Sequence, residues 1–169
     1  MTSIGEYTLR PARETDVPAL LDIYDYEVQN GVATFDYETP SLAERIQWFR
    51  TEFGPTYPLT VAADKTDKAV GYCGIQRFNS KKGYDRTVVI TLYIHRDHFR
   101  KGLGLALSKD IIAKARELGH RNIIAMIAAE NKSSMTLFER LGFKTNGLFP
   151  ALGFKFGRDL DVAYSQLTL

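Results

Sequence analysis

The chain has 169 residues, 44% of them hydrophobic and 25% charged, which is typical of a single globular domain large enough to bury a core. Its formal net charge of +2, without a block of Lys or Arg, argues against a dedicated nucleic-acid binder. Cys73 is the only cysteine, so the chain has no intrachain disulfide and no cysteine-built metal site. We find neither a charged leader before an apolar run nor an apolar stretch of bilayer length, and therefore expect a soluble cytoplasmic protein.

Residues 7–12 predict the first strand, and the segment after it predicts a helix. Thr15 is in position to cap this helix. A second helix is expected after Pro40, because Ser41 and Glu44 have the spacing of a capping box. The first helix has four apolar residues on one face: Val17, Leu20, Tyr24 and Val28.

Strand patterns occupy the middle of the chain. We expect strands near residues 59–63 and 69–78, joined by a turn at residues 64–67. A polar loop then leads to a strand at residues 87–95. The helix that follows ends at Gly119, and its apolar stripe comprises Leu103, Leu107, Ile111 and Leu118.

The last third of the chain repeats this alternation. Residues 122–128 predict a strand, and a short helix is expected between Asn131 and Gly142. Two further strands are expected at residues 143–148 and 158–167. Strands and helices in this order predict an α/β (α+β) fold, with a mixed sheet and helices on both faces.

The most informative segment is the turn between the strand at residues 87–95 and the central helix. It is basic and contains two glycines, Gly102 and Gly104, which we expect in a surface turn. Glycines let backbone N–H groups approach a ligand closely, and a helix N-terminus presents unpaired donors with a favourable dipole. The turn therefore suits a pyrophosphate. An ordinary connection with solvated basic residues explains it equally well.

Two nucleotide-binding motifs do not match this turn. A P-loop requires a Lys-Ser/Thr pair after its second glycine, and residues 102–110 contain none. A dinucleotide fingerprint requires a third glycine where Leu107 stands. A backbone site for an anion, late in a mixed sheet, remains.

Short motifs along nearly the whole chain carry a family resemblance. They are Leu9-Arg10-Pro11-Ala12, Thr34-Phe35, Trp48-Phe49, Gly71-Tyr72, Gly83-Tyr84, Tyr93-Ile94-His95, Lys101-Gly102-Leu103-Gly104, Glu130-Asn131, Leu141-Gly142-Phe143 and Lys155-Phe156-Gly157-Arg158. Each motif alone is weakly specific, whereas their order and spacing together are specific. The chain resembles the GNAT superfamily of N-acetyltransferases. It is most similar to the phosphinothricin acetyltransferase-like branch, which acetylates small amines, including amino-acid analogues.

The resemblance implies a single domain, residues 1–169, with a GNAT-like, mostly antiparallel sheet of six to seven strands. It implies acetyl-CoA as the acetyl donor and a homodimer. No metal is implied, and the three histidines of the chain show no metal-ligand spacing. The pantetheine arm of acetyl-CoA lies, in this superfamily, in a gap between two adjacent strands. Here these would be the strand with Leu92-Tyr93-Ile94 and the strand at residues 122–128.

The resemblance also assigns roles to individual residues. The backbone N–H near Leu92 would polarise the thioester carbonyl as an oxyanion donor. Asn131 and Ser134 would meet the pantetheine or the far end of the cofactor, although Asn131 also fits a plain helix N-cap. The pyrophosphate would accept from the N–H groups of Arg100, Lys101, Gly102, Leu103, Gly104 and Leu105.

The chain departs from its family at the phosphate turn and at two catalytic positions. Phe99 replaces the usual Arg or Gln, and Arg100 stands where a glycine is common. Val89 occupies the position of a glutamate proposed as the general base. Phe138 replaces the Tyr or His on the late helix and cannot protonate a thiolate. The catalytic residues are therefore left open, with water reaching Glu27, Glu38, Tyr84 or Tyr93 as candidate proton relays.

For the acceptor, the branch points to a cation and aromatic side chains beside a cleft, which suit an amino acid. Phe35 and Trp48 fit a core role equally well, and we expect Trp48 in the core. The substrate-binding candidates are Phe35, Arg45, Lys82, Gly83 and Tyr84.

Three functions fit the sequence. The first is an acetyl-CoA-dependent N-acetyltransferase acting on a small molecule, such as an amino acid or an analogue of the phosphinothricin or methionine sulfoximine/sulfone type. The second is a protein N-acetyltransferase, which would need an open groove for a peptide. The third, motivated by Val89 and Phe138, is a catalytically weakened module that only binds an acyl-CoA. The sequence does not identify the acceptor amine.

Overall fold

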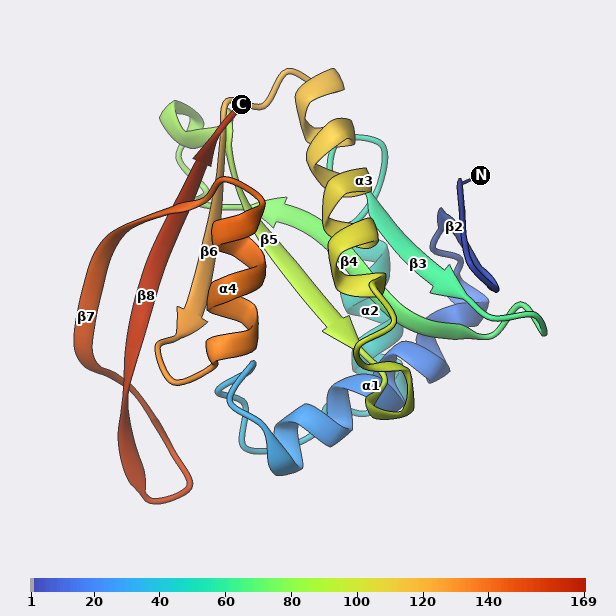
Figure 1. The fold of residues 1–169 in the computed structure, drawn as a ribbon, viewed down its shortest axis with the longest axis horizontal. Coiled ribbons are helices and arrows are strands. Elements are labelled where there is room, and N and C mark those ends of the chain that lie inside the picture. Colours follow the sequence, from blue (N-terminus) through green and yellow to red (C-terminus); the bar gives the residue numbers. More distant parts are fainter. Residues whose placement is uncertain (1) are drawn as a thin grey trace.

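The computed structural model describes residues 2–169, which form one mixed β-sheet of eight strands and four α-helices (Figure 1). The strand order is β1-β2-β3-β4-β5-β6-β8-β7. The strands are β1 (Thr2–Ile4), β2 (Tyr7–Pro11), β3 (Leu59–Ala63), β4 (Ala69–Arg77), β5 (Thr87–Ile94), β6 (Asn122–Ala128), β7 (Lys144–Lys155) and β8 (Arg158–Thr168). The predicted fold class is confirmed.

Helices cover both faces of the sheet, as predicted. They are α1 (Val17–Asn30), α2 (Leu42–Glu52), α3 (Leu103–Glu117) and α4 (Lys132–Arg140). In Figure 1, α3 and α4 lie in front of the sheet, while α2 lies behind it. Two hydrophobic clusters reflect this division: Leu107 of α3 and Phe138 of α4 share one, and Leu20 of α1 packs in the other with Trp48. The expectation of Trp48 in the core is confirmed.

The strands β5 and β6 form the only parallel pair within residues 2–169, and they pair at only three positions. The last of these joins Val89 to Ile124. Beyond it, β5 stays paired with β4 up to Ile94, and β6 stays paired with β8 up to Ala128. Each strand follows its outer neighbour, so the two arrows diverge in Figure 1. The facing backbone edges of residues 90–94 and 125–128 are thus left without a strand partner.

The predicted N-terminal cap is correct for α2 and wrong for α1. Ser41 and Glu44 form the predicted capping box, with the Ser41 N–H donating to Glu44 Oε2 at 2.7 Å. Thr15 does not cap α1, because it lies in a short 3₁₀ helix, Glu14–Asp16, that precedes it. Asp16 is the residue at the N-cap position. Its carboxylate instead accepts the N–H of Arg13 at 2.8 Å.

The C-terminal hairpin is longer than predicted. The expected strand at residues 143–148 stops before Pro150, whereas β7 continues to Lys155. A bulge absorbs the interruption: Ala151 has φ of 51°, and its N–H donates to Asp161 Oδ1 at 2.8 Å. Phe156 and Gly157, both with positive φ, then form the two-residue hairpin turn.

Eight strands exceed the expected six to seven because of β1. This strand has three residues, which are too few to show an alternating pattern. Gly5, with φ of 56°, turns the chain so that β1 pairs antiparallel with β2. Leu118, predicted in the buried stripe of the central helix, is instead exposed just beyond the end of α3.

A buried ion pair ties the N-terminal strand to α1. Arg10 of β2 donates to both oxygens of Asp16, at 2.7 and 2.8 Å, and the two side chains are 3% and 7% exposed. The Nε of Arg10 donates to Asp67 in the β3–β4 turn at 2.7 Å. One guanidinium thus joins β2, the start of α1 and the β3–β4 turn.

We predict that Arg10→Met lowers the free energy of unfolding by about 3–5 kcal/mol, because it leaves the Asp16 carboxylate buried and unpaired. Urea denaturation followed by circular dichroism measures the change. Arg50→Met is the control, since the Arg50–Glu14 pair is exposed and should leave stability near the native value. Equal losses in the two variants would contradict the role of burial.

Candidate active site

The divergence of β5 and β6 opens a cavity of about 230 Å³. Its two long walls are residues 89–93 of β5 and residues 125–128 of β6. Ala33, from the segment between α1 and α2, and Gln76 of β4 complete the lining together with residues of α4. Backbone groups on the separated strand edges need partners, and the cavity leaves room for a ligand with amide groups to supply them.

Several predicted residues meet in this cavity. Leu92 and Tyr93 lie on its β5 wall, and Asn131 and Ser134 lie at the start of α4. Val89 and Phe138, the two departures from the family pattern, also line it. Both residues that line the cavity at these two positions are apolar. Ile94 continues β5 beyond the lining residues.

Asn131 is the N-cap of α4. Its Oδ1 accepts the N–H of Ser134 at 3.2 Å and the hydroxyl of Ser133 at 3.0 Å. This confirms the cap interpretation, and the same residue lines the cavity. The cap fixes the first turn of α4 at the rim of the cavity.

The phosphate turn ends in an open helix N-terminus. Gly102 is the N-cap of α3, with φ of 77°, and no side chain caps this end. Ala106 is the first residue whose N–H bonds back, to the Gly102 carbonyl at 3.1 Å. The preceding N–H groups of the first turn have no acceptor within the helix. With exposed Arg100 and Lys101 beside them, they form an electropositive anion site.

The two glycines of this turn differ in their surroundings. Gly102 is exposed, as expected, whereas Gly104 lies inside the first turn of α3 and is half-buried. A Cβ atom on Gly104 would lie 3.3 Å from Leu137 Cδ2 and 3.6 Å from Leu92 Cδ2. The expectation that Gly104 lies in a surface turn is therefore wrong. Its packing brings the anion site up against Leu92 on the cavity wall.

Tyr93 joins the cavity to the segment after α1. Its hydroxyl donates to the Ala33 carbonyl at 3.1 Å. The ring of Tyr93 contacts the rings of Tyr24 and Tyr72, each with a centroid distance of 5.3 Å. Burial raises the pKa of Tyr93 well above its usual range. Tyr93 thus remains a neutral phenol, and its hydroxyl hydrogen is already engaged in the hydrogen bond to the Ala33 carbonyl.

Arg45 lies behind this aromatic group and outside the cavity lining. It is buried, with its guanidinium carbon 3.4 Å from the Trp48 ring centroid and 4.4 Å from that of Tyr24. One Nη donates to the Tyr72 hydroxyl at 2.9 Å, and Nε has no partner among the described residues. The α2 helix thus directs Arg45 into the core, apart from the residues that line the cavity.

The other acceptor candidates also lie outside the cavity lining. The ring of Phe35 packs against Gly153 of β7. Lys82, Gly83 and Tyr84 form an exposed 3₁₀ helix before β5, at the end where β5 still pairs with β6. This location explains their absence from a cavity that opens toward the other end of the strands.

Sequence reasoning missed Gln76 and Ala33. Gln76 is directly paired with Val89 across β4 and β5. The change from apolar to polar residues at Gln76 and Arg77, the end of an otherwise apolar strand, was the available signal for Gln76. Nothing in the local sequence indicated Ala33, because a hydrogen bond from Tyr93, distant in sequence, places it at the cavity.

Of the candidate proton relays, only Tyr93 lines the cavity. Glu27 lies on α1, where its carboxylate abuts Gly31. Burial raises the pKa of Glu27, although the charge of Lys155 opposes the shift. Glu38 and Tyr84 are exposed elsewhere. Glu27 is therefore one residue layer behind the cavity wall.

Within residues 2–169, we find no group of three or more His, Cys, Asp or Glu side chains arranged to hold a metal ion. None of the helices in this part of the chain is long and apolar enough to cross a membrane.

Known proteins share this fold and much of the sequence. Residues 9–163 match the profile of the Acetyltransferase (GNAT) domain. The L-methionine sulfoximine/L-methionine sulfone acetyltransferase of Pseudomonas aeruginosa strain PAO1 is 36% identical over 162 residues, 96% of this chain and 94% of the relative.

Two solved structures are similar along their whole length. A GNAT superfamily phosphinothricin acetyltransferase from Sinorhizobium meliloti, in complex with AcCoA, has a TM-score of 0.94 and 37% identity, covering 98% of this chain and 89% of that one. A ribosomal-protein-alanine N-acetyltransferase from Brucella melitensis has a TM-score of 0.91 and 32% identity, covering 96% and 98%.

Proposed function

This chain belongs to the GNAT acetyltransferase family, and we propose that it transfers the acetyl group of acetyl-CoA to the amine of an amino acid or an amino-acid analogue. One observation carries the proposal: Leu92, which lines the β5–β6 cavity, has its side chain beside Gly104 in the first turn of α3, whose N-terminus no side chain caps. We also propose that the protein acts in the cytoplasm and needs no metal ion.

The residues of the site fit acetyl-CoA, which a solved relative holds. Leu92 and Ile94 would bond the amide groups of the pantetheine arm, because their backbone N–H and C=O groups point away from β4 and lack a β6 partner. The backbone of Tyr93 pairs with β4 instead, and Tyr93 lines the cavity between them. The N–H groups from Arg100 to Leu105 would hold the pyrophosphate, where a Cβ on Gly104 would crowd Leu137. Asn131 and Ser134 would contact the arm from α4. Once bound, acetyl-CoA supplies the thioester carbon that the amine attacks.

The chain contributes to the reaction mainly by positioning. The Leu92 backbone N–H would stabilise the developing oxyanion. Neither Val89 nor Phe138 can exchange a proton, and the Tyr93 hydroxyl is already bonded to Ala33. Water in the cavity would therefore carry the proton away from the amine. Positioning two reactants can supply about 7–11 kcal/mol, whereas general acid–base help adds about 10²–10⁴-fold.

The absence of a carboxylate at position 89 favours amines that lose a proton easily. The α-amino group of a peptide, with a pKa of ~8, costs about 1.4 kcal/mol to deprotonate at pH 7, whereas a lysine amine near ~10.4 costs about 4–5 kcal/mol. This difference favours an α-amino group over a lysine side chain.

A panel of acceptors tests the proposed function. Free-thiol release from acetyl-CoA should be faster with amino acids, methionine sulfone and phosphinothricin than with alkylamines or lysine peptides. Titration calorimetry with acetyl-CoA runs in parallel. Binding without thiol release on any amine would contradict catalysis.

A protein N-acetyltransferase is the second candidate, since the Brucella relative is named for a ribosomal-protein alanine. Its substrate amine is also an α-amino group, so the same deprotonation cost applies. Faster acetylation of peptide N-termini than of free amino acids in the panel would replace the first proposal with this one.

We predict that Gly102→Val weakens acetyl-CoA binding by more than about tenfold, because a side chain at the helix start blocks approach to the backbone N–H groups. Gly119→Val is the matched control: it has φ of 81° against 77° for Gly102 and lies at the other end of α3. Both variants carry similar backbone strain. Calorimetry should show weakened binding only for Gly102→Val, and equal affinities would remove the anion-site assignment.

We predict that Val89→Glu raises turnover at neutral pH, with a larger gain for amines of high pKa, because it restores a base to the cavity wall. Val89→Gln is the control, having the same shape without a titrating group. Circular dichroism checks folding, since burying a carboxylate costs stability. Superimposable pH–rate profiles for the two folded variants would place position 89 away from the reacting amine.

We propose that the protein forms a homodimer through the β7–β8 hairpin. The hairpin exposes five large apolar side chains, each 45–56% accessible: Leu148, Phe149, Leu152, Phe154 and Phe156. Exposed apolar surface of this kind marks interfaces, and a second copy of the same surface is its simplest complement.

We predict that Leu152→Glu with Phe154→Glu yields monomers in sedimentation equilibrium, whereas the native protein sediments as a dimer. Leu118→Glu is the control, because Leu118 is similarly exposed at the end of α3. A native monomer, or dissociation by the control substitution, would contradict this interface.

A further inference from the structure

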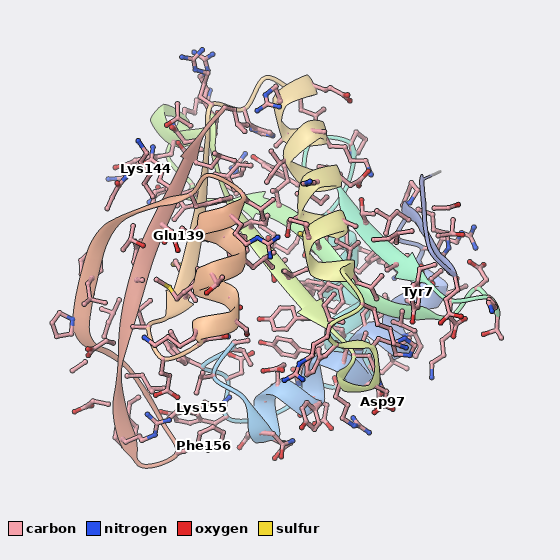
Figure 2. The ribbon with its side chains drawn as sticks, viewed as in Figure 1. Tyr7, Asp97, Glu139, Lys144, Lys155 and Phe156 are labelled. Atoms are coloured by element: carbon pink, nitrogen blue, oxygen red, sulfur yellow. The ribbon has the colours of Figure 1, made fainter. Side chains whose placement is uncertain are left out.

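Lys155, the last residue of β7, is a buried lysine with an unusual set of partners. Only 2% of it is exposed. Its ammonium donates to the carbonyl oxygens of Glu27 at 3.1 Å, Gly31 at 2.7 Å and Thr34 at 2.8 Å. Figure 2 shows Lys155 beside the segment that follows α1. The hydrogen bonds join residues more than 120 positions apart in the sequence.

The three bonds account for all of the ammonium donors, since a lysine ammonium has three N–H groups. Burial lowers the pKa of Lys155, and the nearby carboxylates of Glu27 and Asp36 oppose this. A buried lysine is rare, because removing its charge from water is costly. Three carbonyl acceptors offset the cost of burying the ammonium. The lysine and the segment after α1 therefore hold each other in place.

The segment held by Lys155, residues 31–34, contributes Ala33 to the cavity lining, and the Ala33 carbonyl accepts the Tyr93 hydroxyl. Tyr24 of α1 adds a hydrogen bond to this segment, between its hydroxyl and the Thr34 hydroxyl at 2.7 Å. The segment is therefore held by Lys155 from the β7–β8 hairpin, by Tyr93 from the sheet and by Tyr24 from α1.

This segment belongs to the acceptor side of the cavity. The proposed acetyl-CoA contacts come from the end of β5 and from α3 and α4. Residues 31–34 instead follow α1, which packs in the cluster on the opposite face from α3. An amine entering from this side would meet Ala33 and Tyr93 before it reached the thioester carbon.

We propose that Lys155 is a positioning residue, which fixes residues 31–34 as a wall of the acceptor site and so sets the affinity for the acceptor amine. The role of Lys155 in acceptor affinity rests on the proposed acetyl transfer.

Lys155→Met tests it, because methionine fills the space of the lysine stem but bonds none of the three carbonyls. We expect the KM of the acceptor to rise by more than about tenfold, with the dissociation constant of acetyl-CoA within about twofold of native. Lys144→Met is the matched control: Lys144 is exposed at the far end of the same strand (Figure 2). An acceptor KM within twofold of native, or an equal loss of acetyl-CoA affinity, would overturn the proposal.

Hydrogen exchange supplies a readout that needs no activity. The amides of residues 31–36 should exchange faster in Lys155→Met than in Lys144→Met, and unchanged exchange would show that Lys155 does not hold the segment. If the native protein transfers no acetyl group, the proposed function fails while exchange still decides the role of Lys155.

Gly31→Ala is a second variant, in case Lys155→Met does not fold. Gly31 has an extended backbone that alanine adopts freely, but its Cβ would overlap the Glu27 carboxylate. The Glu27 carboxylate or Gly31 must therefore move, which disturbs the segment that Lys155 holds. A raised acceptor KM with unchanged acetyl-CoA affinity supports the proposal, and an unchanged KM contradicts it.

Discussion

The functional geometry depends on one constraint in the sheet, namely that β5 and β6 are each bound more extensively to an outer neighbour than to each other. Three paired positions, ending at Val89 and Ile124, join them before they part. Full pairing with β4 and β8 prevents the strands from closing the gap. Because exposed backbone groups demand partners, this gap is a site for an extended ligand with amides. The cavity, the open N-terminus of α3 and the start of α4 are all arranged around it.

The two faces of the sheet contribute different parts of the proposed site. On one face, α3 and α4 supply backbone donors and the Asn131 cap, which suit the donor substrate. On the other, α1 and the segment after it bring Ala33 to the cavity, held there by Tyr93 and Lys155. Polar groups with unusual burial occur on this second face. A site whose one titratable lining residue, Tyr93, is already hydrogen-bonded to Ala33 depends on such rigidity, since positioning is its main source of rate enhancement.

Residues that the family resemblance assigned to the cofactor fared differently from those it assigned to the acceptor. Leu92, Tyr93, Asn131 and Ser134 were brought together because each sits at the end of a regular element. Arg45 was expected at the acceptor, yet α2 directs it between Trp48 and Tyr24. A charged residue on a helix predicts a function only once the buried face of that helix is known.

The sequence by itself determined the order of strands and helices, the glycine turn before α3 and the capping box of α2, because these follow from spacing along the chain. It also identified the family and the apolar substitutions at positions 89 and 138. Only the tertiary structure decided where β5 and β6 separate, that β7 continues through a bulge, and that Lys155 reaches the Gly31 carbonyl. These features arise from contacts between residues distant in sequence, which a local pattern does not encode.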